Sequence, residues 1–355
     1  MGSYSVETPK PWIETPCLYS GPLSRAAGCN IYLKLDNLQP SGSFKSRGIG
    51  YMMQRAAEAS PTGNIHFYCS SGGNAGLACA TSAATMGCRA TIVVPTLAPA
   101  HMAEKLRGLG ATVVQTGSNF AEADAFLKRE LLAHDPLGVY VSPFDHPDIW
   151  AGAETLADEI SAQMRRAGPD GGPVDVDAIV CNVGGGGMLV GILDGIERVW
   201  PQAPAPRPRV LAVETRGAHS LNASVVAGEL TTLPAVTSIA VSLGAPRVAA
   251  RAYQLVRQRQ DADAAAGAPP QVVSAVVSDA EAVMGSARFL DDARLLVEVS
   301  CGATVSVAYN GDLRRHLGKG LGDAEWAARN VVLIVCGGSH TTLDMLLKYK
   351  AQFGV

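Results

Sequence analysis

A lysine flanked by small residues is the first candidate for chemistry in this chain. Lys45 lies in the run SGSFKSRG at 41–48, shortly after the apolar run 31–35. At a junction between a strand and a helix, such an amine can form a Schiff base and transfer protons, because its stem is flexible and its basicity is tunable. These residues alone leave a plainer interpretation open, in which Ser43 caps a helix and Lys45 is solvated in its first turn.

Two glycine-rich stretches are candidates for binding anions. The run SSGGNAG at 70–76 separates an apolar run from an alanine-rich helical pattern, so helix amides and hydroxyls can hold a carboxylate. The run GGGGM at 184–188 follows the apolar run 178–183, and its bare amides suit a phosphate. It has neither the lysine of a Walker loop nor the spacing of a dinucleotide fingerprint. A capped turn and a flexible connection, respectively, stay open as alternatives.

A fourth stretch, CGGS at 336–339, ends the apolar run 331–335. Ligands of parallel α/β sheets bind at the carboxyl ends of the strands. The thiol of Cys336 can therefore face a ring nitrogen of a ligand. A buried cysteine that only packs is the alternative.

Composition favours a small-molecule enzyme. The chain has 355 residues, 47% of them apolar and 17% charged, and a net charge of −3, so it can bury a large core and has no basic excess for nucleic acid or an anionic membrane. The eight cysteines show no metal-ligand spacing. No apolar block marks a leader or a membrane span, and we expect a cytoplasmic protein.

Short apolar runs that alternate with helix-length segments predict an α/β fold. Because these runs are almost continuously apolar, we expect mostly parallel sheets covered by helices, arranged in two lobes. We expect a small substrate-side domain at 39–147 and a large cofactor-binding domain at 1–38 and 148–355. Surface loops are expected at 167–173, 201–208 and 261–270. The predicted strands are 31–35, 65–69, 91–94, 112–115, 139–141, 178–183, 210–213, 295–297 and 331–335.

The four stretches, in this order and spacing, resemble the pyridoxal-phosphate (PLP) enzymes of the second fold type, the tryptophan synthase β-like class. Within it the chain is most similar to the serine/threonine dehydratases, and particularly to the eukaryotic L-serine dehydratases (L-serine ammonia-lyases). The similarity runs from about residue 15 to the C-terminus. It includes the segments PSGSFK, IVVP, GGGG, TSIA and VCGGS.

The resemblance implies a role for each matching residue. Lys45 would be the Schiff-base lysine and the catalytic base, with Phe44 packed on the cofactor ring. The cofactor would otherwise be held by Asn74, Gly184, Gly185, Gly186, Gly187, Met188, Cys336 and Ser339. Ser71, Gly72 and Asn74 would bind the substrate carboxylate, and a monovalent cation such as K⁺ would lie at Glu214, Ala218, Ser220, Leu243 and Ala245. From the residues alone, Glu214 can instead pair with Arg216 or accept backbone hydrogen bonds.

The resemblance further implies β-elimination of L-serine to pyruvate and ammonia, and of L-threonine to 2-oxobutyrate, by a homodimer. Threonine deamination as the main activity and β-replacement of the cysteine-synthase type are alternatives on the same fold. A non-catalytic metabolite-binding module is a third. Gly72 stands where several serine dehydratases carry alanine, which leaves the preference between serine and threonine open.

Overall fold

The computed structural model describes residues 9–60, 64–200 and 207–355. The chain divides into two compact units, Met1–Ile13 with Gln39–Gly152, and Glu14–Leu38 with Ala153–Val355. The predicted small domain, residues 39–147, falls within the first unit. The assignment of a substrate side and a cofactor side to the two domains stays a prediction.

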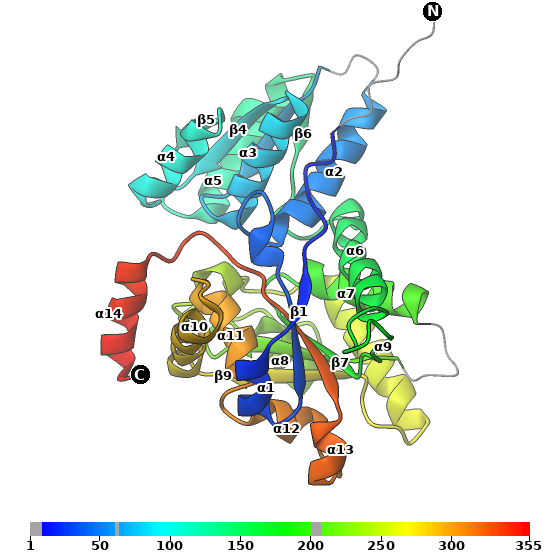
Figure 1. The fold of residues 1–355 in the computed structure, drawn as a ribbon. Coiled ribbons are helices and arrows are strands. Elements are labelled where there is room, and N and C mark those ends of the chain that lie inside the picture. The colour runs from blue at the N-terminus through cyan, green and yellow to red at the C-terminus, as the bar shows by residue number, and fades with distance from the viewer. Residues whose placement is uncertain (1–8, 61–63, 201–206) are drawn as a thin grey trace, which may run out of the picture. The chain divides into compact units, whose positions relative to one another are not determined.

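The first unit is built on a four-stranded sheet in which all neighbouring strands are parallel, in the order β5-β4-β3-β6 (Figure 1). Its strands are β3 (His66–Ser70), β4 (Arg89–Val94), β5 (Thr112–Gln115) and β6 (Gly138–Tyr140). Its helices are α2 (Lys45–Ala59), α3 (Asn74–Met86), α4 (Ala100–Gly108) and α5 (Phe120–Phe126), and α6 (Pro147–Met164) begins in this unit and ends in the second.

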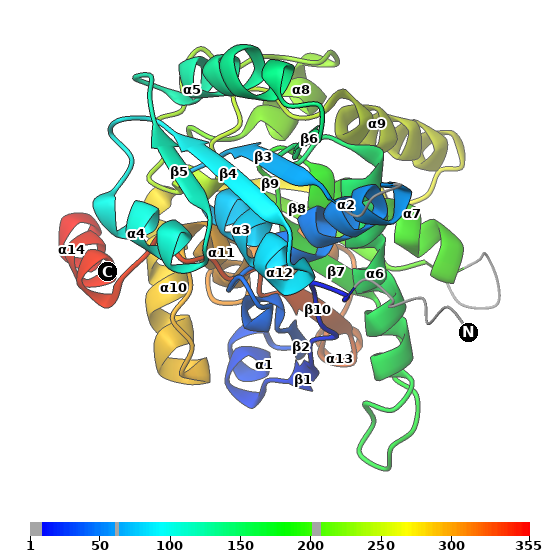
Figure 2. The same cartoon turned by 90° about the horizontal axis from the view of Figure 1, so that it is seen from above.

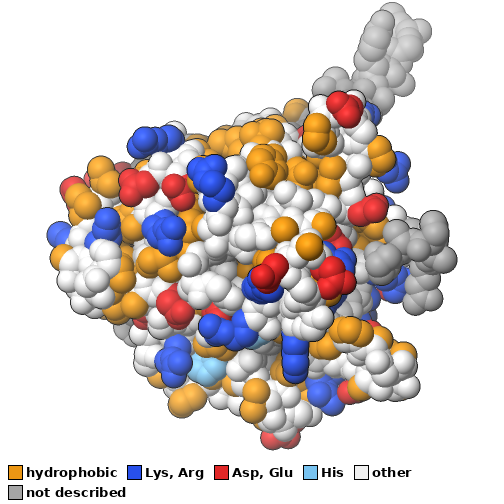
Figure 3. Space-filling model, turned by 60° about the horizontal axis from the view of Figure 1, so that its bottom comes forward, with side chains coloured by type: hydrophobic (Ala, Val, Ile, Leu, Met, Phe, Trp, Pro, Cys, Tyr) orange, Lys and Arg blue, Asp and Glu red, His pale blue; other side chains and the backbone are white. Residues whose placement is uncertain are grey.

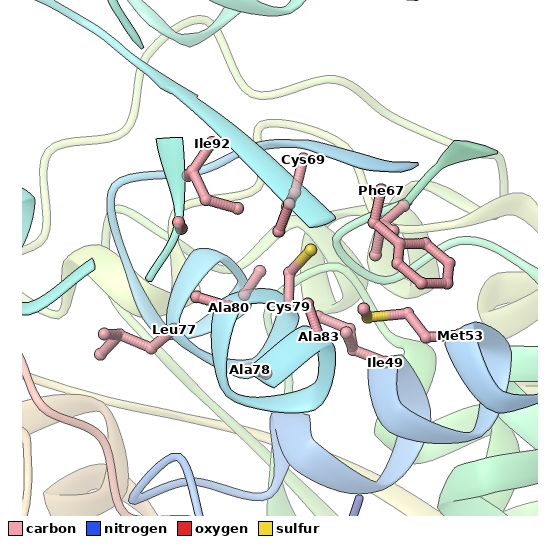
Figure 4. Close-up of a cluster of buried hydrophobic side chains, with 14 of the residues drawn as sticks. Ile49, Met53, Phe67, Cys69, Leu77, Ala78, Cys79, Ala80, Ala83 and Ile92 are labelled. Carbon is pink, nitrogen blue, oxygen red and sulfur yellow. The ribbon is translucent and has the colours of Figure 1, made fainter. Parts of the chain in front are cut away.

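Small side chains let α3 pack closely under this sheet. Its sequence is rich in alanine, a strong helix former, and it ends at Gly87, whose φ of 67° is the left-handed conformation of a helix C-cap. Figure 4 shows Cys79 and the alanines of α3 between α2 and the sheet, with Phe67 and Cys69 of β3 among the contacts. This buried cluster fixes the starts of α2 and α3, which carry the first two candidate stretches.

The second unit contains a six-stranded sheet in the order β1-β2-β10-β7-β8-β9. Neighbouring strands are parallel except at one edge, where β1 runs antiparallel to β2. The strands are β1 (Cys17–Tyr19), β2 (Asn30–Lys34), β7 (Ala178–Asn182), β8 (Arg209–Thr215), β9 (Val272–Val277) and β10 (Asn330–Ile334). All five residues of β7 are buried, as expected for a strand covered on both faces.

Helices cover this second sheet, as the views along two directions show (Figures 1 and 2). The helices of this unit are α1 (Gly21–Ala27), α7 (Gly187–Val199), α8 (Ser220–Ala227), α9 (Ala250–Ala265), α10 (Asp279–Ala293), α11 (Val299–Ser306), α12 (Asp312–Leu317), α13 (Asp323–Ala327) and α14 (Leu343–Phe353). Of these, α14 packs on α10 and not on the sheet. Short 3₁₀ helices cover Asp36–Leu38, Leu132–His134 and Val241–Leu243, and a π-helical turn covers Leu127–Leu131.

The α/β class and the mostly parallel sheets are confirmed, but the strand predicted at 295–297 is wrong. Those three residues connect α10 to α11, and the edge of the sheet is taken by β9, which the sequence did not predict. The short antiparallel β1 was also not predicted. The loop predicted at 261–270 is wrong in its first half, because α9 continues to Ala265. The loop predicted at 201–208 lies mostly outside the described residues.

Among the described residues, no helix combines the length and the apolar composition needed to cross a bilayer.

Two glycines allow α10 and α11 to cross at short range. All eight residues of α11 are buried. A Cβ added to Gly302 would lie 2.1 Å from the Ala282 carbonyl oxygen and 2.2 Å from Ser286 Oγ, and one added to Gly285 would lie 2.3 Å from the Gly302 oxygen. These contacts are too short for any side chain.

We therefore expect Gly302→Ala to lower the free energy of unfolding by about 2 kcal/mol or more, because the helices must move apart. Gly108→Ala is the matched control. It places the same methyl group at the end of α4 with no atom within 4 Å, and should change stability by less than about 1 kcal/mol. Urea denaturation of both variants measures the difference, and equal midpoints would contradict this account of the crossing.

Candidate active site

Lys45 is the first residue of α2 and is half-buried. Its ammonium group donates to the carbonyl oxygen of Pro143. It lies 5.4 Å from the ring centre of Phe44 and 6.0 Å from that of Phe144. Lys45 therefore donates to a carbonyl and lies near two aromatic rings, so its ammonium group is not fully solvated.

Serine hydroxyls shape the loop that precedes Lys45. Gly42 adopts a φ of 79°, which favours glycine. Ser46 Oγ donates to Ser41 Oγ at 2.8 Å, and the Ser41 amide donates to Ser46 Oγ at 3.2 Å. Ser43 is buried but makes no capping hydrogen bond, and Phe44 occupies the N-cap position. The loop therefore closes on itself and leaves the helix start without a side-chain cap.

The stretch 70–76 joins β3 to α3. The Gly73 amide donates to Ser71 Oγ at 3.2 Å, and Gly73 is the N-cap of α3, again with no side-chain cap. Asn74 is the first residue of α3 and is 9% exposed. A Cβ at Gly76 would lie 2.0 Å from the Ser71 carbonyl oxygen, so only glycine permits this turn. The amides of the first turn are thereby presented beside Ser71, which suits a carboxylate.

The glycine run 184–187 connects β7 to α7. Gly186 has a φ of 91°, and a Cβ there would lie 2.7 Å from Ala252 Cβ. At Gly184 a Cβ would lie 3.1 Å from the Leu243 Cα, and the Gly185 carbonyl accepts from the Ala249 amide at 3.0 Å. The loop is thus packed against its neighbours and is not a flexible connection.

The same loop presents main-chain donors. Gly186 caps α7 without a side chain, and Gly187 and Met188 are the first residues of a helix of 13 residues. The first amides of a helix have no partner within the helix, and the dipole is positive there. A phosphate group fits this arrangement in charge and in hydrogen bonding.

Cys336 follows the last residues of β10 and is 4% exposed. The side-chain amide of Asn182, at the end of neighbouring β7, donates to Cys336 Sγ at 3.0 Å and to the Ser300 carbonyl at 2.7 Å. The hydrogen bond with Cys301, burial and the charge of Glu298 raise the pKa of Cys336 well above the ordinary thiol value. The group at this strand end is therefore a neutral thiol at physiological pH.

A buried glutamate, Glu298, holds the loop that follows Cys336. Glu298 is 3% exposed, and its carboxylate accepts from Ser242 Oγ at 2.6 Å and from the His340 amide at 2.7 Å. A Cβ at Gly338, whose φ is 111°, would lie 2.1 Å from the Glu298 carboxyl carbon. Ser339, half-buried, lies between Gly338 and His340. The loop after Cys336 is thus shaped around a carboxylate.

Sequence reasoning singled out neither Asn182 nor Glu298 as a site residue. Each had a signal: Asn182 is a lone amide at the end of the apolar run 178–183, and Glu298 is a lone charge in the apolar run 295–305. Buried polar groups of this kind are normally hydrogen-bonded and specific in role. The sequence did not show which groups they meet.

Glu214, in the predicted cation site, is fully buried in β8. It accepts from the Leu221 amide at 2.9 Å and from the Asn222 amide at 2.7 Å, so the alternative of backbone hydrogen bonds is what the structure shows. Burial raises its pKa to about 8, and the two amides oppose that shift. Ser220, also buried, has a hydroxyl with no hydrogen-bond partner among the described residues. Ala218, Leu243 and Ala245 lie in turns of the same unit.

The groups that each unit offers by itself can now be compared with PLP. In the second unit, a side-chain-free loop at a helix start fits its phosphate, and a neutral thiol fits an unprotonated pyridine nitrogen. In the first unit, a half-buried lysine fits its aldehyde. These features define an α/β enzyme of the second PLP fold type.

Comparison with known proteins gives the family. Residues 10–337 match the family model described as pyridoxal-phosphate dependent enzyme, and the chain belongs to that family. It is 42% identical over 339 residues to a serine dehydratase-like protein of Rattus norvegicus, covering 95% of this chain and 94% of the relative. It is 40% identical over 344 residues to an L-serine dehydratase/L-threonine deaminase of Bos taurus, covering 97% and 96%. The solved structure of a fungal L-serine ammonia-lyase from Rhizomucor miehei superimposes with a TM-score of 0.83 at 33% identity, covering 96% of this chain and 99% of the other.

The buried carboxyl group of Glu214 predicts a pH dependence of stability. Its pKa in the folded chain, about 8, lies above the ordinary value of 4.5. The folded state therefore holds a proton that the unfolded state releases, and stability falls as pH rises from about 4.5 through about 8. Glu214→Gln, which stays neutral, should flatten this slope in thermal melts across that range. Glu229→Gln, at an exposed position, should keep the wild-type slope. A Glu214→Gln slope equal to wild type would contradict the assignment.

Proposed function

We propose that this chain is a PLP-dependent L-serine ammonia-lyase that converts L-serine to pyruvate and ammonia and also accepts L-threonine. The names of its relatives support the substrate class, since they include serine dehydratase and threonine deaminase at about 40% identity over nearly the whole chain. The observation that carries the reaction type is the neutral, buried thiol of Cys336 beside Asn182.

The thiol matters because it selects among PLP reactions. Bound PLP supplies an electron sink for the bond that breaks at Cα. An acidic residue at the pyridine nitrogen would keep that nitrogen protonated and strengthen the sink, whereas a neutral thiol does not. A neutral group at this position would therefore favour loss of the β-hydroxyl over transamination.

We assign the residues of each unit as follows. Lys45 would hold the cofactor, its free amine would take the Cα proton of the substrate, and Phe44 would pack beside it. Ser71, Gly72 and Asn74 orient the substrate carboxylate, and Asn74 also contacts the cofactor. Gly184, Gly185, Gly186, Gly187 and Met188 hold the phosphate through main-chain amides. Cys336 would face the ring nitrogen, with Ser339 close by.

A monovalent cation is part of the proposal. K⁺ at Glu214 and Ser220, with the carbonyls of Ala218, Leu243 and Ala245, would give the unpartnered Ser220 hydroxyl a partner and favour the ionised carboxylate. The cation would compete with the proton on Glu214. KCl should therefore stabilise the wild type more at pH 9 than at pH 6, and Glu214→Gln should lose this difference.

A homodimer and a cytoplasmic location also stay predictions. Light scattering of the purified protein tests the oligomeric state. Threonine deamination as the main activity, or β-replacement, would appear as preferential 2-oxobutyrate formation or as a need for a second nucleophile. A binding module without catalysis would show cofactor absorbance and no keto acid.

The role of Lys45 gives a direct test. Lys45→Ala should reduce keto-acid formation from L-serine by at least about 1,000-fold, because both the attachment point and the base are lost. Lys348→Ala, on the exposed side of α14, is the matched control and should keep wild-type activity. Borohydride reduction followed by peptide mapping should label residue 45 in the wild type. Labelling elsewhere, or an active Lys45→Ala protein, would refute the assignment.

Gly72 gives a test of substrate preference. A Cβ at Gly72 would lie 3.4 Å from Ala98 Cβ and from Val94 Cγ1, which is an ordinary contact distance. Gly72→Ala should therefore fold normally and add one methyl group to the proposed carboxylate-binding loop. We expect kcat/KM for L-threonine to fall about tenfold more than that for L-serine, because threonine carries the extra methyl. An unchanged ratio of the two values would show that residue 72 does not limit the pocket.

A further inference from the structure

A cavity lies in the second unit, away from the candidate active-site loops of that unit. Its volume is about 1010 Å³, and it is lined by residues at the beginnings of β7, β8 and β10, including Ala178, Arg209 and Val331. The candidate cofactor-binding groups, in contrast, follow the ends of β7 and β10. Because these strands are parallel, the cavity lies at the opposite edge of the same sheet. Figure 3 turns the end of this unit that carries α12 and α13 toward the viewer and shows basic and acidic side chains intermixed there.

Basic side chains outnumber acidic ones in the lining. Three of the five basic groups already have carboxylate partners: Arg207 with Glu197, Arg315 with Asp312, and Arg329 with Asp177. Arg209 and Lys319 have no carboxylate partner within the part of the chain that the structure describes. Asp175 and Asp177 are the only acidic side chains among the described lining residues. The cavity therefore has an excess of positive charge.

Arg209 is held in place by main-chain carbonyls. Its Nε donates to the Pro270 oxygen at 3.1 Å, Nη1 to the Leu317 oxygen at 3.0 Å and Nη2 to the His316 oxygen at 3.4 Å. A guanidinium group has five N–H donors, so two remain after these three bonds. Burial lowers the pKa of Arg209, and the charge of Asp263 opposes that shift. Arg209 is therefore a fixed, partly desolvated cation with two N–H donors left over. An oxyanion would accept hydrogen bonds from these donors and balance the charge.

Apolar and aromatic side chains complete the wall. Trp200, Trp326, Pro270 and Leu321 line the cavity together with Arg209. Trp326 is held by a hydrogen bond from its indole nitrogen to the Ala27 oxygen at 2.9 Å. Fixed aromatic walls bury flat apolar groups favourably. Basic and flat apolar side chains thus line the same cavity.

We propose that this cavity binds a small organic oxyanion, a phosphate or carboxylate group attached to a flat apolar ring. The anion lies against Arg209 and Lys319, and the ring lies against the tryptophan and proline wall. The inference rests on the second unit alone and does not depend on the proposed reaction.

Calorimetric titration of protein saturated with PLP and freed of excess cofactor tests the proposal, because the cofactor then fills the phosphate loop. Four probes separate the parts of the ligand: phenyl phosphate, benzoate, inorganic phosphate and phenol. At least one of the first two should bind with one site per chain, and the tighter of them identifies the anion. Inorganic phosphate and phenol should each bind at least about tenfold more weakly. No saturable binding of either ring-bearing anion, or equal binding of inorganic phosphate, would overturn the ligand class.

Two variants locate the site. Lys319→Glu reverses an exposed charge and should weaken binding of the preferred probe at least about tenfold, while the protein stays folded. Arg209→Gln should weaken it further, and thermal melts report whether that variant folds. Lys348→Glu makes the same charge change on α14 and is the matched control, which should bind as the wild type does. Wild-type affinity in Lys319→Glu, or equal losses in Lys319→Glu and Lys348→Glu, would overturn the location.

Discussion

Close approach of the main chain at the carboxyl ends of parallel strands is the constraint on which the candidate site depends. At Gly186 after β7, at Gly76 after β3 and at Gly338 after β10, a side chain would meet an atom too near to tolerate, and at Gly184 its neighbours would have to shift. Because side chains are excluded, amides at the starts of α3 and α7 are left uncapped. Anion binding then follows from the backbone itself, reinforced by the helix dipoles.

Buried polar side chains determine the hydrogen bonding and the charge at these strand ends. Asn182 links the ends of β7 and β10 through the Cys336 thiol, while Glu298 fixes the loop beyond it through Ser242 and His340. The thiol stays neutral because it is hydrogen-bonded to Cys301, buried, and close to the Glu298 carboxylate, all of which raise its pKa. The pKa of the thiol at this strand end is therefore set by Asn182 and by the segment 298–301, which lie far apart in the chain.

The two edges of the large sheet have different chemical character. Its carboxyl edge carries glycine loops, a thiol and the buried Glu214, whereas its amino edge carries an arginine held by carbonyls next to tryptophans. Parallel strands make such a separation possible, because all strand ends of one kind gather at one edge. One sheet can thus support two binding sites without overlap.

The sequence by itself determined the α/β class, most of the strands and the four stretches that carry the chemistry, because apolar periodicity and glycine runs are local signals. It misplaced a strand at 295–297 and missed β9, since which segment pairs at a sheet edge depends on competition among distant segments. Only the tertiary structure decided that Lys45 meets the Pro143 carbonyl, that Glu214 accepts two helix amides, and that Asn182 and Glu298 meet Cys336 and its loop. These are contacts between residues far apart in the chain, and burial, hydrogen bonding and pKa are properties of such contacts and not of any one segment.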